Sequence, residues 1–246
     1  MTRVALVTGA SRNIGRGIAL ALAADGYEIA CFGRDKAALE ETADLIRKAG
    51  GVASVHVGDV ASDETLEAFA SDAAAQHGGI DLVVNNAGIM HEAKAADVTP
   101  DKFRQVLNVN LVSCYTLARA AYPHLRDRKG VVVNVGSMFA SMGVPSVASY
   151  CTSKAGIEGL TRALASEWAR DGIRVVAVAP GYILSDISRD ILDDPALLKQ
   201  VISRIPAHRY GEAGEVGDLV AFLASPKAGF ITGETYVIDG GQRMSV

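Results

Sequence analysis

The sequence predicts an α/β fold in which helices cover both faces of a parallel, doubly wound sheet. Short apolar segments rich in valine and isoleucine alternate with stretches of helical periodicity along the whole chain. The apolar segments are continuous rather than alternating with polar residues, which is typical of strands buried on both faces. Glycine, proline or a polar residue follows most of these segments directly. About seven strands are therefore expected in one layered sheet.

The individual elements follow in regular order. Strands are expected at residues 4–7, 28–32, 53–57, 80–84, 130–135, 173–178 and 235–238. Helices are expected after a Gly-rich turn at 8–15, at 36–49, 63–77 and 100–121, from Tyr150 onward, at 195–202 and at 215–224. No linker or composition shift divides the 246 residues, so we expect one domain over 1–246. The irregular part at about 182–210 is long enough to be a substrate segment.

Composition and charge exclude several classes of function. Apolar residues make up 49% and charged residues 21%, as in a globular protein with a substantial core. The net charge is -4 with scattered lysine and arginine, so no nucleic-acid or membrane partner is expected. No signal-like region precedes Val4 and no apolar run approaches a bilayer span, so the cytoplasm is expected. The three cysteines and five histidines show no metal-ligand spacing, and no metal is expected.

The Gly-rich turn between the first strand and the first helix is a candidate phosphate site. It contains Gly9, Asn13 and Gly15, and such a junction directs backbone N–H groups and the positive end of the helix to one place. The alternative is an ordinary helix start capped by Ser11 or Asn13.

The end of the second strand predicts which dinucleotide binds. An acidic side chain there suits the ribose of NAD, whereas arginine suits the 2′-phosphate of NADP. The strand ends in Gly33 and Arg34, with Asp35 one position later, and Arg12 of the turn can reach the same area. We therefore expect NADP, with NAD less favoured; both arginines could instead be ordinary surface residues.

Tyr150 and Lys154 are four residues apart on an expected helix, so their side chains lie one above the other. An ammonium within one turn favours the phenolate, which makes Tyr150 a usable proton donor or acceptor. This pair alone could also occur by chance. The unusual residues that follow other strands, including Asp59, Gly88, Ser137 and Pro180, are all expected at one sheet edge, where ligands bind in such folds.

Taken together, these motifs resemble the short-chain dehydrogenase/reductase family in its shorter, single-domain form with a Rossmann fold. The motifs are Thr8-Gly9-x-x-x-Asn13-x-Gly15, Asn85-Asn86-Ala87-Gly88, Ser137, Tyr150-x-x-x-Lys154 and Pro180-Gly181. The resemblance implies that Tyr150 exchanges the proton, Ser137 hydrogen-bonds the substrate oxygen, Lys154 holds the nicotinamide ribose, and Asn110 anchors a water linked to Lys154. The family usually has glycine at the position of Asn13, and often threonine at that of Ser185.

The implied activity is hydride transfer between NADPH and a ketone or secondary alcohol. The cofactor-binding residues implied are Gly9, Ser11, Arg12, Asn13, Ile14, Gly15, Arg34, Asp59, Val60, Asn86, Ala87, Gly88, Tyr150, Lys154, Pro180, Gly181, Ile183 and Ser185. The chain is similar both to 3-oxoacyl-acyl-carrier-protein reductases and to gluconate 5-dehydrogenases, so the substrate is a 3-oxoacyl thioester or a keto-sugar acid. The family suggests a homodimer or homotetramer. The rival interpretation is a non-catalytic, cofactor-binding regulator or scaffold.

Overall fold

The computed structural model describes residues 2–184 and 194–244. Its strands are β1 (Arg3–Thr8), β2 (Tyr27–Gly33), β3 (Ala53–Val57), β4 (Leu82–Asn85), β5 (Val131–Val135), β6 (Arg174–Pro180) and β7 (Thr235–Ile238). They form one sheet in the order β3-β2-β1-β4-β5-β6-β7, with every neighbouring pair parallel. The direction of winding reverses between β1 and β4, which confirms the predicted doubly wound sheet and places a ligand crevice at this switch point.

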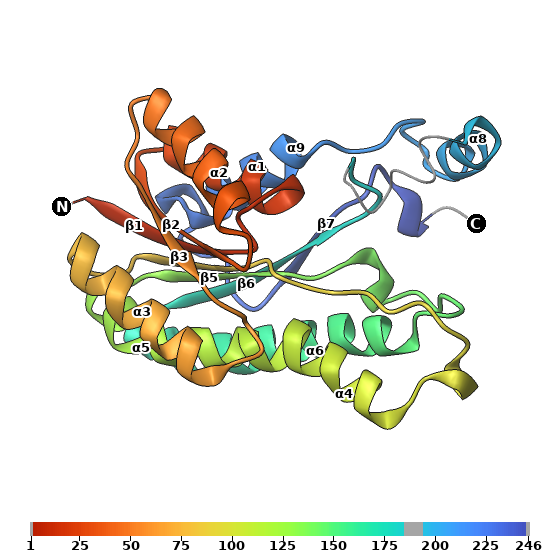
Figure 1. The fold of residues 1–246 in the computed structure, drawn as a ribbon, viewed down its shortest axis with the longest axis horizontal. Helices are drawn as coiled ribbons and strands as arrows, with labels where there is room; N and C mark the ends of the chain where they lie inside the picture. Colours follow the sequence, from red (N-terminus) through yellow and green to blue (C-terminus); the bar gives the residue numbers. More distant parts are fainter. Residues whose placement is uncertain (1, 185–193, 245–246) are drawn as a thin grey trace.

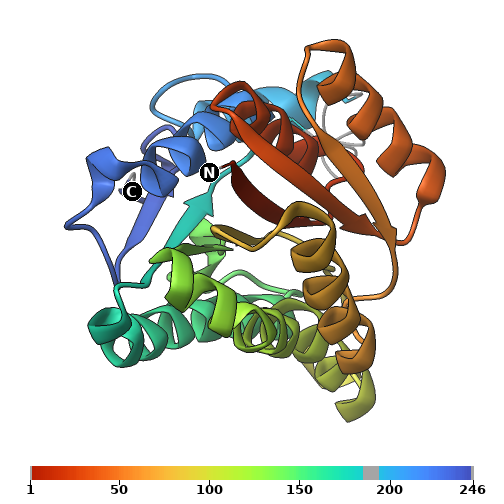
Figure 2. The same ribbon diagram turned by 90° about the vertical axis from the view of Figure 1, so that its left-hand side faces the viewer.

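Helices cover the sheet on both faces, as Figure 1 shows. The helices are α1 (Asn13–Ala24), α2 (Lys36–Lys48), α3 (Asp63–His77), α4 (Pro100–Leu107), α5 (Ser113–Arg128), α6 (Ala148–Trp168), α8 (Pro195–Ser203) and α9 (Ala213–Ala224). Helices α1, α2 and α9 lie on one face and α3, α5 and α6 on the other; the view in Figure 2 separates the two layers.

Each face of the sheet has its own apolar core. On one face Ile18 and Leu22 of α1 pack with Val216 and Val220 of α9 over alternate strand residues. On the other face Leu66 and Phe69 of α3, with residues of α5 and α6, cover the remaining strand residues. The strands are therefore buried from both sides, which is the physical reason for their unbroken apolar sequence.

The single helix predicted at 100–121 is wrong in its detail. The helical path is interrupted by a π-helical segment, η2 (Asn108–Val112), and then continues as α5 to Arg128, with Pro123 inside it. A π segment accommodates an extra residue per turn and is frequent at functional sites. Here it carries Asn110, one of the predicted site residues.

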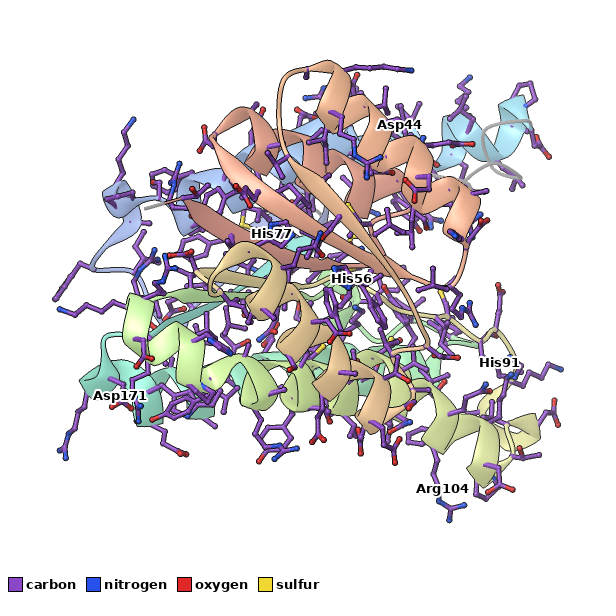
Figure 3. All side chains as sticks on the ribbon, turned by 60° about the vertical axis from the view of Figure 1, so that its left-hand side comes forward. Asp44, His56, His77, His91, Arg104 and Asp171 are labelled. Carbon is purple, nitrogen blue, oxygen red and sulfur yellow. The ribbon has the colours of Figure 1, made fainter. Side chains whose placement is uncertain are left out.

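All seven strands run toward the same end of the molecule, where α4 and α8 lie (Figure 1). His91, in the segment after β4, lies at this end together with Arg104 of α4, whereas Asp171 lies at the other end (Figure 3). The carboxyl ends of the strands, where ligand binding is predicted, therefore lie together at one end of the fold. Among the described helices, none is both long and apolar enough to cross a membrane.

Candidate functional site

The Gly-rich turn connects β1 to α1 in a left-handed backbone conformation. Gly9 has φ +67° and Asn13 has φ +49°, a value that asparagine tolerates better than most side chains. The N-cap residue is Arg12, whose own side chain makes no capping hydrogen bond. Capping by Ser11 or Asn13, the ordinary alternative, is therefore wrong. The positive end of α1 therefore begins directly after the Gly-rich turn, a position at which helices commonly bind anions.

Asn86 and Thr8 hold this turn against the end of β4. The Asn86 side-chain amide donates to the carbonyls of Thr8 (2.9 Å) and Gly9 (3.3 Å). The Thr8 hydroxyl accepts from the N–H groups of Asn86 (3.0 Å) and Ala87 (3.1 Å). A side chain on Gly9 would lie 2.8 Å from the Asn86 amide, so glycine is required by this contact as well. The predicted segments 8–15 and 86–88 thus form one rigid unit.

A second set of hydrogen bonds that holds the Gly-rich turn was not predicted from the sequence. Arg16 donates from Nε to the Thr42 hydroxyl (2.9 Å) and from its guanidinium to the carbonyl of Ser11 (2.6 Å). Thr42, fully buried on α2, donates in turn to the carbonyl of Ala10 (2.9 Å). Nothing in the local pattern distinguishes Arg16 from a surface arginine, because its partners come from another helix.

The end of β2 lies directly beside the turn, since the N–H of Gly9 donates to the carbonyl of Phe32 (2.8 Å). Arg34, two residues later, is exposed. Asp35 is the N-cap of α2 and accepts from the N–H of Ala38 (3.1 Å). The nearest carboxylate after β2 is therefore used to cap a helix, whereas Arg34 is exposed. Asp59, after β3, similarly accepts from the N–H of Ala61 (2.9 Å), with Val60 partly packed in the core beside it.

Tyr150 and Lys154 occupy the first turns of α6, as predicted. Lys154 is buried, and its Nζ donates to the carbonyl of Val135 at 2.7 Å. Nζ lies 5.6 Å from the centroid of the Tyr150 ring. Within the described residues Lys154 forms no ion pair, and the phenol of Tyr150 beside it is half-buried.

Asn110 connects the π segment to the loop after β4 and to α6. Its Oδ1 accepts from the N–H of Ile89 (2.8 Å), and its Nδ2 donates to the carbonyl of Ile89 (2.9 Å) and to the hydroxyl of Ser153 (3.0 Å). A side chain on Gly88 would lie 3.3 Å from Asn110 Oδ1 and 3.7 Å from Lys154 Nζ. Gly88, Asn110 and Lys154 are therefore neighbours, although they are far apart in the sequence.

Ser137 lies at the end of β5 and begins the short helix η3 (Met138–Ala140). Its Oγ accepts from the N–H of Phe139 at 3.2 Å, which leaves its own proton free to donate. The ring of Phe139 meets the ring of Tyr150 edge-on, with centroids 6.3 Å apart. Ser137 and Tyr150 thus border the same region from β5 and α6.

A ladder of buried amides supports this region. Asn85 donates to Asn134 Oδ1 (2.9 Å), and Asn134 donates to the hydroxyl of Thr161 on α6 (3.0 Å). Asn134 and Thr161 are fully buried. The sequence analysis did not identify this ladder, although an asparagine between the valines of β5 is a visible signal that a buried partner exists.

The segment after β6 completes the site. Gly181 donates to the carbonyl of Ile238 (2.9 Å), and a side chain there would lie 2.6 Å from the Asp239 Cβ. Ile183 is buried and forms a parallel bridge with Gly211. Ser185 lies outside the described residues. In α8, which confirms the helix predicted at 195–202, Asp194 caps the first turn through the N–H groups of Ala196 and Leu197. A cavity of about 450 Å³ here is lined by Pro195, Leu198, Lys199, Ile202, Ser203 and His208.

Two histidines belong to a polar cluster away from this edge. Glu28 Oε2 and His77 Nδ1 are 2.6 Å apart, and the Ser54 hydroxyl lies 2.8 Å from His77 Nε2 and 2.9 Å from His56 Nε2. Figure 3 shows both histidines beside α3 and the sheet. Burial lowers the pKa of His56. No group of three or more potential ligand side chains among residues 2–184 and 194–244 could hold a metal ion.

Comparison with known proteins identifies relatives of this chain over nearly its whole length. A family model described as Enoyl-(Acyl carrier protein) reductase matches residues 9–243. The chain is 40% identical to 3-oxoacyl-[acyl-carrier-protein] reductase FabG of Staphylococcus aureus, over 99% of both chains. The chain belongs to the short-chain dehydrogenase/reductase family. Another curated member is 2-dehydro-3-deoxy-D-gluconate 5-dehydrogenase of Bacillus subtilis, 37% identical over 97% of this chain and 94% of the relative.

A solved member of the short-chain dehydrogenase/reductase family has nearly the same fold. The crystal structure of a gluconate 5-dehydrogenase from Burkholderia cenocepacia, in complex with NADP and tartrate, superposes with a TM-score of 0.93 at 33% identity. The match covers 99% of this chain and 96% of that one. Both relationships named from the motifs, to the acyl-carrier-protein reductases and to the gluconate dehydrogenases, are thereby confirmed.

Proposed function

We propose that this protein interconverts a ketone and a secondary alcohol with NADP as cofactor. The observation that carries the proposal is the pair formed by the half-buried phenol of Tyr150 and the buried ammonium of Lys154, whose Nζ lies 5.6 Å from the phenol ring centroid. Ser137, with a free hydroxyl proton, borders the same region. These three groups supply a proton donor, a positive charge beside it, and a hydrogen-bond donor.

The residues present fit a dinucleotide. The N-terminus of α1 directly after the Gly-rich turn suits a pyrophosphate, and the exposed Arg34 at the end of β2 suits a 2′-phosphate. NADPH, when bound, supplies the hydride. Gly9, Ser11, Arg12, Asn13, Ile14, Gly15, Arg34, Asp59, Val60, Asn86, Ala87, Gly88, Lys154, Pro180, Gly181, Ile183 and Ser185 are the residues proposed to hold it.

In the proposed reaction each polar group of the site has one task. Ser137 donates a hydrogen bond to the carbonyl oxygen of the substrate and orients it. Tyr150 donates its hydroxyl proton to that oxygen as it becomes an alkoxide, and it takes the proton back when an alcohol is oxidised. Lys154 compensates the phenolate left behind, and Asn110 fixes the backbone at Ile89 and, through Ser153, the first turns of α6.

Two substrate classes remain candidates. A 3-oxoacyl thioester is supported by the likeness to the acyl-carrier-protein reductase and by the largely apolar cavity at α8, within the proposed substrate segment at about 182–210. A keto-sugar acid is supported by the likeness to the gluconate dehydrogenases.

We further propose a cytoplasmic enzyme of one domain that forms a homodimer or homotetramer. Exposed apolar side chains such as Phe222 and Phe230 support an assembly, which analytical ultracentrifugation would test.

The test is a steady-state assay of NADPH oxidation with a panel of ketones, using wild type and Tyr150→Phe. We expect the variant to lose about 10²–10⁴-fold in kcat while the Kd for NADPH changes little, because the phenol acts on the substrate oxygen. Tyr115→Phe, which removes an exposed phenol on α5, is the matched control and should behave as wild type. NADPH binding without turnover of any ketone or alcohol would instead support a non-catalytic regulator.

A further inference from the structure

Three aromatic rings from three different segments form a continuous row, and one of them is the proposed catalytic phenol, Tyr150. The ring of Phe139, in η3, meets Tyr150 edge-on at 6.3 Å and 88°. The same ring meets Tyr182, in the segment after β6, edge-on at 6.3 Å and 89°. Phe139 therefore lies between two phenols and holds both in the edge-to-face geometry that aromatic pairs favour.

The position of Tyr182 is fixed independently of any ligand. Its carbonyl accepts from the N–H of Gly211 at 2.9 Å, and the N–H of Leu184 donates to the carbonyl of Gly211 at 2.9 Å. Its ring also contacts the buried ring of Tyr210, with centroids 5.9 Å apart. Burial and the nearby Tyr182 raise the pKa of Tyr210 above its ordinary value. Tyr182 is thus preorganised by backbone and ring contacts.

The hydroxyl of Tyr182 has no structural task in the part of the chain that the structure describes. Its ring makes the contacts with Phe139 and Tyr210, whereas no hydrogen bond to another described group involves its hydroxyl. Tyr182 is half-buried, as Tyr150 is. A phenol in this position offers one donor and one acceptor to a bound molecule. Phenylalanine would make the same ring contacts, so the hydroxyl is the part of this side chain that the fold itself does not explain.

We propose that Tyr182 determines specificity by hydrogen-bonding a hydroxyl group that the substrate carries near its reacting carbonyl. This inference rests on the proposed function, because it places the reacting carbonyl of the substrate at Tyr150 and the substrate hydroxyl at Tyr182, at the other end of the row. The preferred substrate is then a polyhydroxylated keto acid and not an unsubstituted 3-oxoacyl thioester. A site built to bind a substrate hydroxyl discriminates strongly against an analogue that lacks it, since the polar group of the site is then left unpaired.

The test compares wild type with Tyr182→Phe on two probe substrates, 5-keto-D-gluconate and the thioester acetoacetyl-N-acetylcysteamine, with NADPH. Tyr182→Phe retains the ring contacts, so the fold and the Kd for NADPH should not change. We expect kcat/KM for the keto-sugar acid to fall about tenfold or more, chiefly through KM, and kcat/KM for the thioester to change less than threefold. Tyr115→Phe is the control for loss of a phenol elsewhere.

Each other outcome overturns the inference. Equal losses on both probes, or no loss on the keto-sugar acid, would show that the hydroxyl does not select the substrate. A wild type that reduces the thioester but not the keto-sugar acid would exclude the named class while leaving the proposed function intact. Reduction of neither these probes nor any ketone of the wider panel would remove the proposed function itself, and the inference with it.

Discussion

The ammonium of Lys154 is held by the main-chain carbonyl of Val135, at 2.7 Å, and not by a carboxylate. Val135 ends β5, two residues before Ser137, so the strand that presents the serine also positions the lysine. A carbonyl fixes the position of the cation but does not neutralise it. The full charge of Lys154 therefore remains available to the phenol of Tyr150 and to a bound ligand.

Replacement of Lys154 by methionine should abolish most activity without unfolding the protein. Methionine fills similar space but has no charge, so the phenolate of Tyr150 loses its compensation. We expect kcat to fall by about two orders of magnitude or more, with a weaker Kd for NADPH. Steady-state kinetics and cofactor titration by fluorescence would measure both. Retention of a tenth or more of the activity would contradict the role assigned to this cation.

Arg34→Ala should change the choice of cofactor. The exposed guanidinium beside the Gly-rich turn is proposed to bind the 2′-phosphate, and charge-assisted hydrogen bonds of this kind contribute about 1.5–3 kcal/mol. We expect KM for NADPH to rise about tenfold or more and KM for NADH to stay nearly constant. Arg47→Ala, in the last turn of α2, the helix that follows Arg34, is the control. An unchanged NADPH/NADH ratio in Arg34→Ala would disprove the assignment.

Two glycines of α9 provide a matched pair for stability. A side chain on Gly217 would lie 2.7 Å from the carbonyl oxygen of Gly17 on α1, whereas a side chain on Gly214 has no atom within 4 Å. Gly217→Ala should therefore destabilise the protein by about 1–3 kcal/mol through overpacking. Gly214→Ala should be neutral or slightly stabilising, because alanine favours helix. Urea unfolding of both variants would measure the difference; equal effects would show that α1 and α9 can separate without cost.

The pair Arg209–Glu215 should give a pH-dependent contribution to stability. Hydrogen bonds from Arg209, and from the N–H of Glu212, lower the pKa of Glu215 from 4.5 to about 2. A carboxyl with a lowered pKa stabilises the folded state above its unfolded pKa, and this stabilisation is lost as the pH falls toward the folded pKa. Arg209→Gln should thus lower the unfolding midpoint slightly at pH 7, since the pair is exposed. The difference from wild type should shrink below pH 4.5; a difference that is constant with pH would contradict the prediction.

The sequence predicted the parts of this protein that local pattern determines. The alternation of strands and helices, the Gly-rich turn after the first strand and the Tyr150–Lys154 pair all follow from neighbours within a few positions. The contacts that assemble the site could not be predicted in this way. Arg16 meets Thr42, Asn110 meets Ile89, and the partners come from elements whose approach depends on the complete sheet.

The π segment was missed for the same reason. Residues 100–121 have ordinary helical periodicity, and the extra residue at Asn108–Val112 is accommodated only in the folded chain, where Asn110 replaces the backbone partners of Ile89. The row of Phe139, Tyr150 and Tyr182 likewise could not be derived from spacing, because the rings come from η3, from α6 and from the segment after β6.

The amide ladder from Asn85 through Asn134 to Thr161 has a consequence for strand alignment. Asn85 and Asn134 are paired residues of β4 and β5, and their side chains bond each other within the buried layer under α6. A shift of one residue between these strands would turn one of the two amides to the opposite face and leave the other without its partner. The ladder thereby fixes the positions of the two loops that carry Gly88 and Ser137 relative to each other. Longer loops could replace them only if Asn85 and Asn134 stay paired.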